Sequence, residues 1–279
     1  MTTLAFILVP WQPDAPAGKE RVAAASAVGL AAAGHQAVII TTDRCAPASY
    51  GSASVVVLDT LAMVAALDRA ELVIAPSAVV LQRASARGYD TTGWRVVPNA
   101  LLVDGRPPST VRRRWLREHG PIRVLARLGP EKGVEELLAA AVGGRLTHRV
   151  QVALCAAGFE AAHRSQQRLL DACRDLAARI GVTILPGLPW NQVPTWLAES
   201  AVVIVPSLAE TFGLVALEAM ASGTPVVAFD IDNLPALIGD GGLLVPREHG
   251  HLGLWRAAGW QARDYRPVHI AGLLVKVVS

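Results

Sequence analysis

The chain has 279 residues, of which 52% are hydrophobic, and its formal net charge is +3. This length suits one large or two ordinary domains with a sizeable core, and so small a charge does not argue for a nucleic-acid partner. Its three cysteines, Cys45, Cys155 and Cys173, have no metal-ligand spacing. We recognise neither a secretory leader nor an apolar run of about 18 residues. We therefore expect a cytoplasmic protein with reduced thiols and no metal ion.

The first hundred residues alternate between short apolar runs and helix-forming stretches. The pattern predicts strands at 4–9 and 37–41, joined by an alanine-rich helix at 19–33 that ends before Gly34. A right-handed crossover between the two strands predicts a parallel sheet. Further strands are expected at 54–58, 72–75 and 95–97, with helices at 60–69 and 79–87.

Residues 101–120 are expected to connect this region to the second half of the chain. They carry four arginines around Trp115, namely Arg112, Arg113, Arg114 and Arg117. A basic amphipathic stretch can lie on a membrane surface, so peripheral contact with a membrane is one interpretation. The interpretation that we prefer is a linker helix with a solvated face.

The second half is expected to contain another parallel sheet. Its strands are predicted near 122–126, 149–154, 182–185, 201–205 and 225–229. The run Val202 to Val205 is apolar throughout, as in a parallel strand covered on both faces. Pro206 ends it, and residues 207–211 form a loop at the carboxyl end of the strand, where ligands bind in open α/β sheets.

A helix is predicted to follow this loop, from about Phe212 to Gly223. Gly213 has no side chain, so a ligand can approach the backbone, and the free N–H groups of the first helical turn suit a phosphate. Glu210, in the loop, is a good acceptor for sugar hydroxyls. Glu218, roughly two turns into the helix, could accept the vicinal hydroxyls of a ribose. The alternative for Glu218 is an ordinary acidic residue on a wet helix face.

Two cations are expected at the same edge of the sheet. Arg127 follows the first strand of the second half, and Lys132 comes near the start of a helix predicted at 131–142. Two converging cations would match the charge that develops on a departing diphosphate, and preorganised charge is usually the largest catalytic contribution. The alternative for Arg127 is an ordinary surface cation.

These residues carry a family resemblance. Glu210 and Glu218 form an E-x7-E motif whose setting resembles the C-terminal domain of the family 4 retaining glycosyltransferases. Residues 124–133 are similar to the strand, turn and helix of that family that carry a basic pair, and Leu185-Pro186-Gly187 with Val193-Pro194 is similar to the stretch before its nucleotide-base loop. The abundance of alanine, and of arginine over lysine, is typical of bacterial proteins from GC-rich genomes.

The resemblance covers about residues 95–246 and implies the GT-B architecture. This is an α/β fold in which two Rossmann-like parallel-sheet domains face a cleft, with the nucleotide-sugar held mainly by the C-terminal one. The predicted divisions are a reduced N-terminal acceptor-side domain at 1–105, a linker at 106–120, a nucleotide-sugar-binding domain at 121–254 and a tail at 255–279 that packs back towards the N-terminal domain.

The resemblance also implies roles for single residues. The two cations would bind the donor diphosphate, the first glutamate would hold hydroxyls of the donor sugar, and the second would hold the ribose. Gly18 lies where the family has a glycine-rich turn near the donor phosphates, although a plain helix start is equally open. The donor would be a UDP-sugar or, alternatively, a GDP-sugar, with no cofactor. The residues implied are Arg127, Lys132 and Glu210 as catalytic residues, and Gly18, Phe212, Gly213, Leu214 and Glu218 as donor-binding residues.

The chain departs from the family between residues 43 and 70. Family members place several more strands and helices there, together with a histidine that reaches the donor sugar, but no histidine occurs between His35 and His119. Asp59 falls nearest that location, with a helix N-cap as its alternative role. The donor half of the site therefore looks intact, whereas the acceptor half looks shortened.

Three hypotheses follow. The first is a working retaining glycosyltransferase that moves a hexose-type sugar to a hydroxyl acceptor. The second is a donor-binding but inactive auxiliary subunit that lends its nucleotide domain to a partner. The third is an epimerase or hydrolase of nucleotide-sugars on the same architecture. A protein partner and a homo-oligomer both remain open, and we prefer the first hypothesis because the binding residues all survive.

Overall fold

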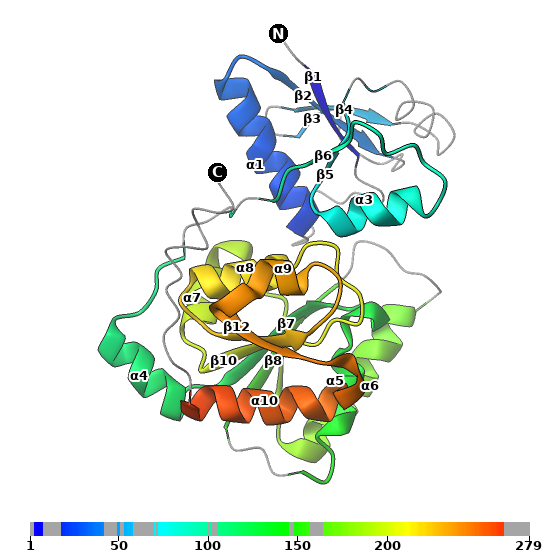
Figure 1. The fold of residues 1–279 in the computed structure, drawn as a ribbon. Helices are drawn as coiled ribbons and strands as arrows, with labels where there is room; N and C mark the ends of the chain where they lie inside the picture. The colour runs from blue at the N-terminus through cyan, green and yellow to red at the C-terminus, as the bar shows by residue number, and fades with distance from the viewer. Residues whose placement is uncertain are drawn as a thin grey trace.

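The computed structural model of the chain describes residues 3–7, 18–41, 49–50, 53–57, 70, 72–99, 101, 105–144, 148–156 and 164–264. Within these residues the strands form three sheets, of four, six and two strands. Figure 1 shows the four-stranded and two-stranded sheets in an upper N-terminal lobe and the six-stranded sheet in a lower C-terminal lobe.

The N-terminal lobe begins as predicted, with β1 (Thr3–Ile7), α1 (Gly18–Ala32) and β2 (Gln36–Thr41). Its four-stranded sheet has the order β1-β2-β4-β3, with β4 at Ala53–Val57 parallel to β2. The edge strand β3 (Ser49–Tyr50), which pairs antiparallel with β4, was not predicted. Alanines on α1 and on the strands let the helix lie close to the sheet around Ile39.

The other described strands of this lobe form a small second sheet. β5 (Ile74–Ala75) and β6 (Arg95–Val96) pair with each other in parallel, and α3 (Ala78–Ser85) lies between them in sequence. Among the described residues, this pair is not hydrogen-bonded to the four-stranded sheet. The helix predicted at 60–69 lies outside the described residues.

The C-terminal lobe is a doubly wound parallel sheet with the order β12-β11-β10-β7-β8-β9. Its strands are β7 (Ile122–Arg127), β8 (Val150–Cys155), β9 (Thr183–Pro186), β10 (Val202–Val205), β11 (Val226–Phe229) and β12 (Gly242–Val245). Five of the six were predicted, and β12 was missed. The helices between them are α5 (Val134–Ala140), α6 (Ser165–Ile180), α7 (Val193–Ala198), α8 (Leu214–Ala221) and α9 (Leu234–Ile238).

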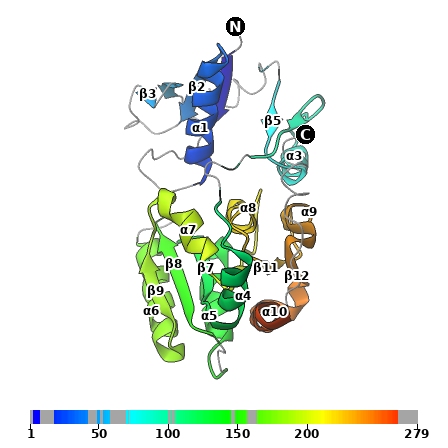
Figure 2. The same cartoon turned by 90° about the vertical axis from the view of Figure 1, so that its left-hand side faces the viewer.

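Helices cover both faces of this sheet (Figure 2). On β10, Val202 and Ile204 belong to one hydrophobic cluster, and Val203 and Val205 belong to the other. Because successive side chains of a strand point to opposite faces, a strand buried on both faces must be apolar at every position. The apolar run from Val202 to Val205 is therefore explained by burial on both faces of the sheet, as we predicted.

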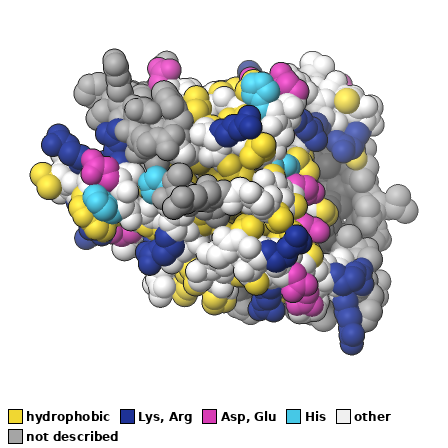
Figure 3. All heavy atoms as spheres, turned by 90° about the horizontal axis from the view of Figure 1, so that it is seen from below, with side chains coloured by type: hydrophobic (Ala, Val, Ile, Leu, Met, Phe, Trp, Pro, Cys, Tyr) yellow, Lys and Arg dark blue, Asp and Glu magenta, His cyan; other side chains and the backbone are white. Residues whose placement is uncertain are grey.

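The predicted linker contains a helix, α4 (Thr110–His119), that packs against the C-terminal lobe. Ser109 caps it, Leu116 is buried, and Arg113 donates hydrogen bonds to the carbonyls of Ala198 and Ser200. Figure 3 views the molecule from below, where basic and acidic side chains are interspersed rather than gathered by sign. The division into domains at residues 105 and 120 stays a prediction.

The expectation for the tail was wrong over residues 255–264. These residues belong to α10 (Gly250–Asp264), whose Leu254, Trp255 and Ala258 are part of the core of the C-terminal lobe. Residues 265–279 lie outside the described residues. No helix among the described residues is both long and apolar enough to cross a bilayer.

The indole of Trp255 completes the end of α5, and this contact gives a stability prediction. Its Nε1–H donates to the carbonyl oxygen of Leu137 at 2.7 Å. Trp255→Phe should lower the free energy of unfolding by about 1–3 kcal/mol, because a buried carbonyl loses its partner. Urea denaturation would measure this loss. Trp190→Phe, at an indole that is 49% exposed, is the control, and equal losses in the two variants would contradict the prediction.

Candidate functional site

The site lies where the strand order of the C-terminal sheet reverses. The chain runs outward from β7 through β8 to β9, then returns to place β10 on the other side of β7. Ligands of such sheets bind at this switch point, beyond the carboxyl ends of the two central strands. The two loops there are residues 128–133, after β7, and residues 206–213, after β10. They are joined by a hydrogen bond from Leu208 N–H to the carbonyl of Glu131, at 2.8 Å.

An ion pair connects the two loops. Lys132 Nζ lies 2.8 Å from Glu210 Oε2, and the two side chains are only 16% and 14% exposed. Ser207 Oγ lies 3.4 Å from the same carboxylate oxygen. Two residues predicted to share a site are therefore in direct contact, although 78 positions separate them. Because both charges are largely shielded from water, each interacts strongly with any charged or hydroxylated group that enters the site.

Arg127 is the last residue of β7 and is partly buried. Its Nη2 lies 3.1 Å from Oε1 of Glu131, and its side chain is 29% exposed. Sequence reasoning missed the role of Glu131 as its partner. The i,i+4 spacing was visible, but the pairing depends on the turn that follows the strand. Instead of one helix at 131–142, a 3-10 turn at Pro130–Lys132 leads through Gly133, at φ 63°, into α5.

The helix that carries Glu218 begins later than predicted. α8 starts at Leu214, and Gly213 precedes it with φ 101°. Phe212 is buried in the core, and a Cβ on Gly213 would lie 2.9 Å from the methyl carbons of both Leu234 and Leu237. The glycine is therefore required by its backbone conformation and by close packing of α9. The reason that we gave for Gly213, close approach of a ligand, is not needed to explain it.

Glu218 is buried, with 8% of its surface exposed. It lies in the middle of α8 among residues that are also buried, so the alternative of a wet helix face is wrong. Acidic side chains are almost never buried without polar partners, because removing a carboxylate from water costs several kcal/mol. Its backbone carbonyl accepts from Ser222 Oγ at 2.8 Å.

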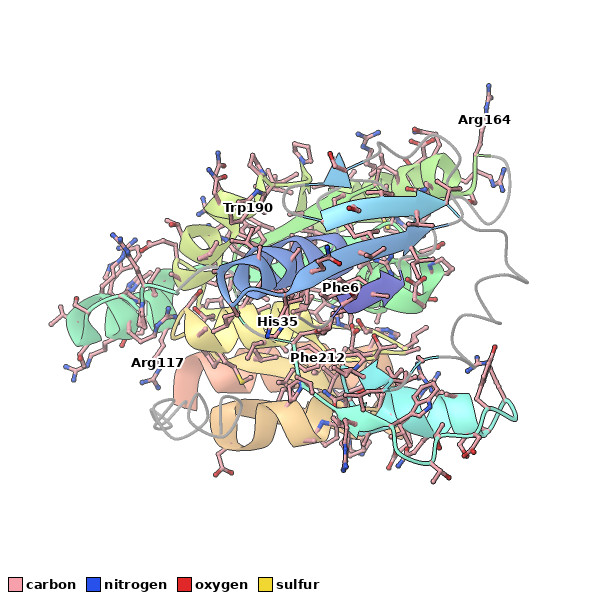
Figure 4. All side chains as sticks on the ribbon, turned by 90° about the horizontal axis from the view of Figure 1, so that it is seen from above. Phe6, His35, Arg117, Arg164, Trp190 and Phe212 are labelled. Atoms are coloured by element: carbon pink, nitrogen blue, oxygen red, sulfur yellow. The ribbon has the colours of Figure 1, made fainter. Side chains whose placement is uncertain are left out.

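The segment directly after β11 is hydrogen-bonded to the loop at residues 206–213, which we call the Glu210 loop. This contact was not predicted. Asp232 Oδ2 accepts a hydrogen bond from Glu210 N–H at 2.7 Å, and Asn233 Nδ2 donates to the carbonyl of Phe212 at 2.8 Å. The available signal was their position, since polar residues directly after β11 lie at the same sheet edge as the loop. Figure 4 views the side chains from above and labels Phe212.

The remaining predicted site residues are not brought to this cluster by any described contact. Gly18 is the first residue of α1, as in the plain helix start that we left open. Asp59 lies outside the described residues. Among the residues that the structure describes, no cluster of three or more histidine, cysteine or acidic side chains could hold a metal ion.

Comparison with known proteins shows what the C-terminal lobe is similar to. Residues 118–251 match the family described as glycosyl transferases group 1. The chain is 32% identical over 200 residues to D-inositol 3-phosphate glycosyltransferase of Frankia alni, covering 64% of this chain and 49% of that protein. It is 35% identical over 163 residues to alpha-maltose-1-phosphate synthase of Mycolicibacterium smegmatis, covering 57% and 40%. The chain thus spans about half or less of the length of these curated relatives.

Solved structures have a similar fold over nearly the whole chain. Sucrose-phosphate synthase of Thermosynechococcus elongatus matches with a TM-score of 0.61 and 17% identity, over 100% of this chain and 98% of that one. WaaG, a glycosyltransferase involved in lipopolysaccharide biosynthesis, matches with a TM-score of 0.62 and 14% identity, over 99% and 93%. HepE of Anabaena, solved in complex with UDP and glucose, matches with 0.56 and 20%, over 98% and 77%. The predicted α/β class with parallel sheets is confirmed, and these neighbours have the GT-B fold.

Proposed function

We propose that this chain, whose residues 118–251 form a glycosyl transferases group 1 domain, transfers a hexose-type sugar from a nucleotide diphosphate-sugar to a hydroxyl acceptor, with retention at the anomeric carbon. The observation that carries the proposal is the shielded Lys132–Glu210 ion pair at the switch point of the parallel sheet. It places a cation for phosphate and an acceptor for sugar hydroxyls side by side.

Donor binding exchanges partners within this pair. The diphosphate takes the ammonium of Lys132, and the carboxylate of Glu210 accepts hydroxyls of the sugar instead. Arg127 supplies the second cation from the end of β7. Glu218 accepts the ribose hydroxyls. UDP is the proposed nucleotide because HepE, whose fold the chain shares, was solved with UDP-glucose, and GDP is the alternative.

The transfer itself needs little from the protein beyond positioned charge. The bond between the anomeric carbon and the diphosphate oxygen breaks, and negative charge develops on that oxygen. Lys132 and Arg127 stabilise this charge. The acceptor hydroxyl attacks from the same face, and its proton passes to the departing phosphate oxygen. Retention then requires no protein nucleophile, so the missing histidine does not prevent turnover.

Release of free nucleotide tests the proposal. UDP-, GDP- and dTDP-sugars are each incubated with the protein, with and without a panel of hydroxylated acceptors. We expect release that depends on both a UDP-sugar and an acceptor. Binding of the nucleotide-sugar without any release would instead favour the inactive auxiliary subunit, and release that is independent of every acceptor would favour a hydrolase.

The role of Glu218 gives a separate binding prediction. Glu218→Gln should weaken UDP binding about tenfold, because a carboxylate accepts hydrogen bonds from hydroxyls more strongly than an amide does. Isothermal titration calorimetry measures the affinity. Glu248→Gln, beyond β12 at Arg247–His249, is the control. An unchanged affinity for UDP in Glu218→Gln, in a protein of normal thermal stability, would exclude the ribose role.

A further inference from the structure

Two hydrogen-bonded contacts tie α3 of the N-terminal lobe to the Glu210 loop of the C-terminal lobe. Ser77, the N-cap of α3, donates from Oγ to the carbonyl of Thr211 at 2.5 Å. Arg83 Nη2 lies 2.8 Å from Asp232 Oδ2. These partners are 134 and 149 positions apart in the sequence. Figure 2 shows α3 above α9 (Leu234–Ile238), the helix that begins shortly after Asp232 in the sequence.

Asp232 relays the second contact to the loop. The carboxylate oxygen that pairs with Arg83 also accepts the Glu210 N–H, at 2.7 Å. Asp232 has φ 52°, in the left-handed region that residues other than glycine seldom adopt. A strained residue of this kind persists where surrounding contacts hold it, and here both contacts act on a single side-chain oxygen.

Glu210 is consequently held at both ends. Asp232 binds its backbone N–H, while Lys132 Nζ and Ser207 Oγ bind or contact its carboxylate. The hydrogen bond to the Glu210 backbone N–H comes from Asp232, and the Asp232 carboxylate is in turn paired with Arg83. The orientation of the Glu210 carboxylate is thereby coupled to the seating of α3 on the C-terminal lobe.

We propose that Arg83 and Asp232 form an interlobe clamp that places Glu210 correctly for sugar transfer. Both are positioning residues, since they act through Glu210 rather than on the donor. The catalytic consequence rests on the proposed function. The clamp forms only when the two lobes meet, so it makes a competent Glu210 loop conditional on lobe closure.

The clamp is poorly suited to a purely stabilising role. The side chains of Arg83 and Asp232 are 36% and 21% exposed, and ion pairs this accessible to water contribute little to folding stability. Removing one should leave the melting temperature nearly unchanged. An effect on the Glu210 loop or on turnover would therefore report positioning.

Amide hydrogen exchange tests the clamp without reference to catalysis. Asp232→Gly removes both contacts and suits the left-handed backbone, so this variant is expected to fold. We expect exchange at the Glu210 amide to accelerate at least tenfold in Asp232→Gly and several-fold in Arg83→Ala. Arg87→Ala, which removes an arginine near the end of the same helix, should leave it unchanged. Unaltered exchange in Asp232→Gly and Arg83→Ala would overturn the inference.

Kinetics then test its consequence. We expect kcat to fall about tenfold in Arg83→Ala and in Asp232→Gly, and to fall no further in the double variant, with KM for the UDP-sugar changed less than about twofold. Arg83→Lys should restore part of kcat. Additive losses, or a normal kcat in both single variants, would refute the positioning role. A wild-type protein without turnover would refute the proposed function alone, and the exchange rates at Glu210 would still decide the clamp.

Discussion

Lys132→Met is expected to lower turnover at least about tenfold while the protein remains folded. Methionine retains the length of the side chain but removes the ammonium that lies 2.8 Å from Glu210. The departing diphosphate then loses a preorganised cation, and losses of this kind are among the largest seen for single residues. Nucleotide release under saturating donor measures kcat. Arg174→Met, on the exposed surface of α6, controls for the loss of one positive charge.

A second variant separates two explanations for this loss. If Lys132 only neutralises Glu210, the double variant Lys132→Met with Glu210→Gln should recover turnover, because it leaves no uncompensated carboxylate. If Lys132 acts on the diphosphate, the double variant should remain as slow as Lys132→Met or slower. A normal rate in Lys132→Met would reject both explanations.

Gly133→Ala is expected to cost about 2–5 kcal/mol of folding stability and to disrupt donor binding. Gly133 has φ 63°, and a Cβ there would lie 2.2 Å from the carbonyl oxygen of Pro206 and 2.9 Å from His251 Nε2. The left-handed conformation costs about 1–2 kcal/mol and overpacking adds about 1–3 kcal/mol. The two loops of the site meet at this point, so relief of the clash must move one of them.

Gly143→Ala is the matched control for this prediction. Gly143 has φ 82°, but nothing lies within 4 Å of a Cβ placed there. The Gly143→Ala variant should therefore lose only about 1–2 kcal/mol of folding stability, which is the cost of the left-handed conformation. It should retain its affinity for UDP. Urea denaturation and calorimetry measure the two quantities. Equal losses of stability in the two variants would show that the contact between Gly133 and Pro206 is not tight.

The ring of His251, on α10, lies beside the close contact between Gly133 and Pro206. Its edge-to-face neighbour is Phe229, with ring centroids 5.0 Å apart. Burial lowers the pKa of His251, which favours the neutral form of the ring. The sequence contained no sign of this placement, because α10 comes more than a hundred positions after Gly133.

The sequence alone predicted the parallel sheet of the C-terminal lobe and the placement of Lys132 and Glu210 at one edge of it, whereas their ion pair was seen only in the structure. Strands buried on both faces must be apolar at each position, as Val202 to Val205 are. The carboxyl ends of parallel strands lie at one edge, so residues after β7 and β10 had to converge. These inferences need only local patterns and a general rule of topology. The assignment of Arg127, Glu218 and the backbone near Gly213 to a donor remains a prediction.

Some elements could be placed only from the tertiary structure, namely the edge strands β3 and β12 and the C-terminal helix α10. β3 has only two residues, and so short an edge strand is stabilised by its pairing with β4 rather than by its own pattern. β12 (Gly242–Val245) lies at the edge of its sheet and pairs with β11. The tail was placed wrongly for a related reason. Trp255 and Leu254 are apolar enough to enter either lobe, and only the space beside α5 decided between them.

Only the fold decided what holds Glu210 in place. Ser77, Arg83 and Asp232 reach the loop from distant parts of the chain, and no periodicity links residues that far apart. Their contacts arise from the way in which two lobes pack. The chemistry expected of the site could thus be predicted from residue types at strand ends, whereas its alignment could not, since alignment depends on side-chain geometry between separately folded parts.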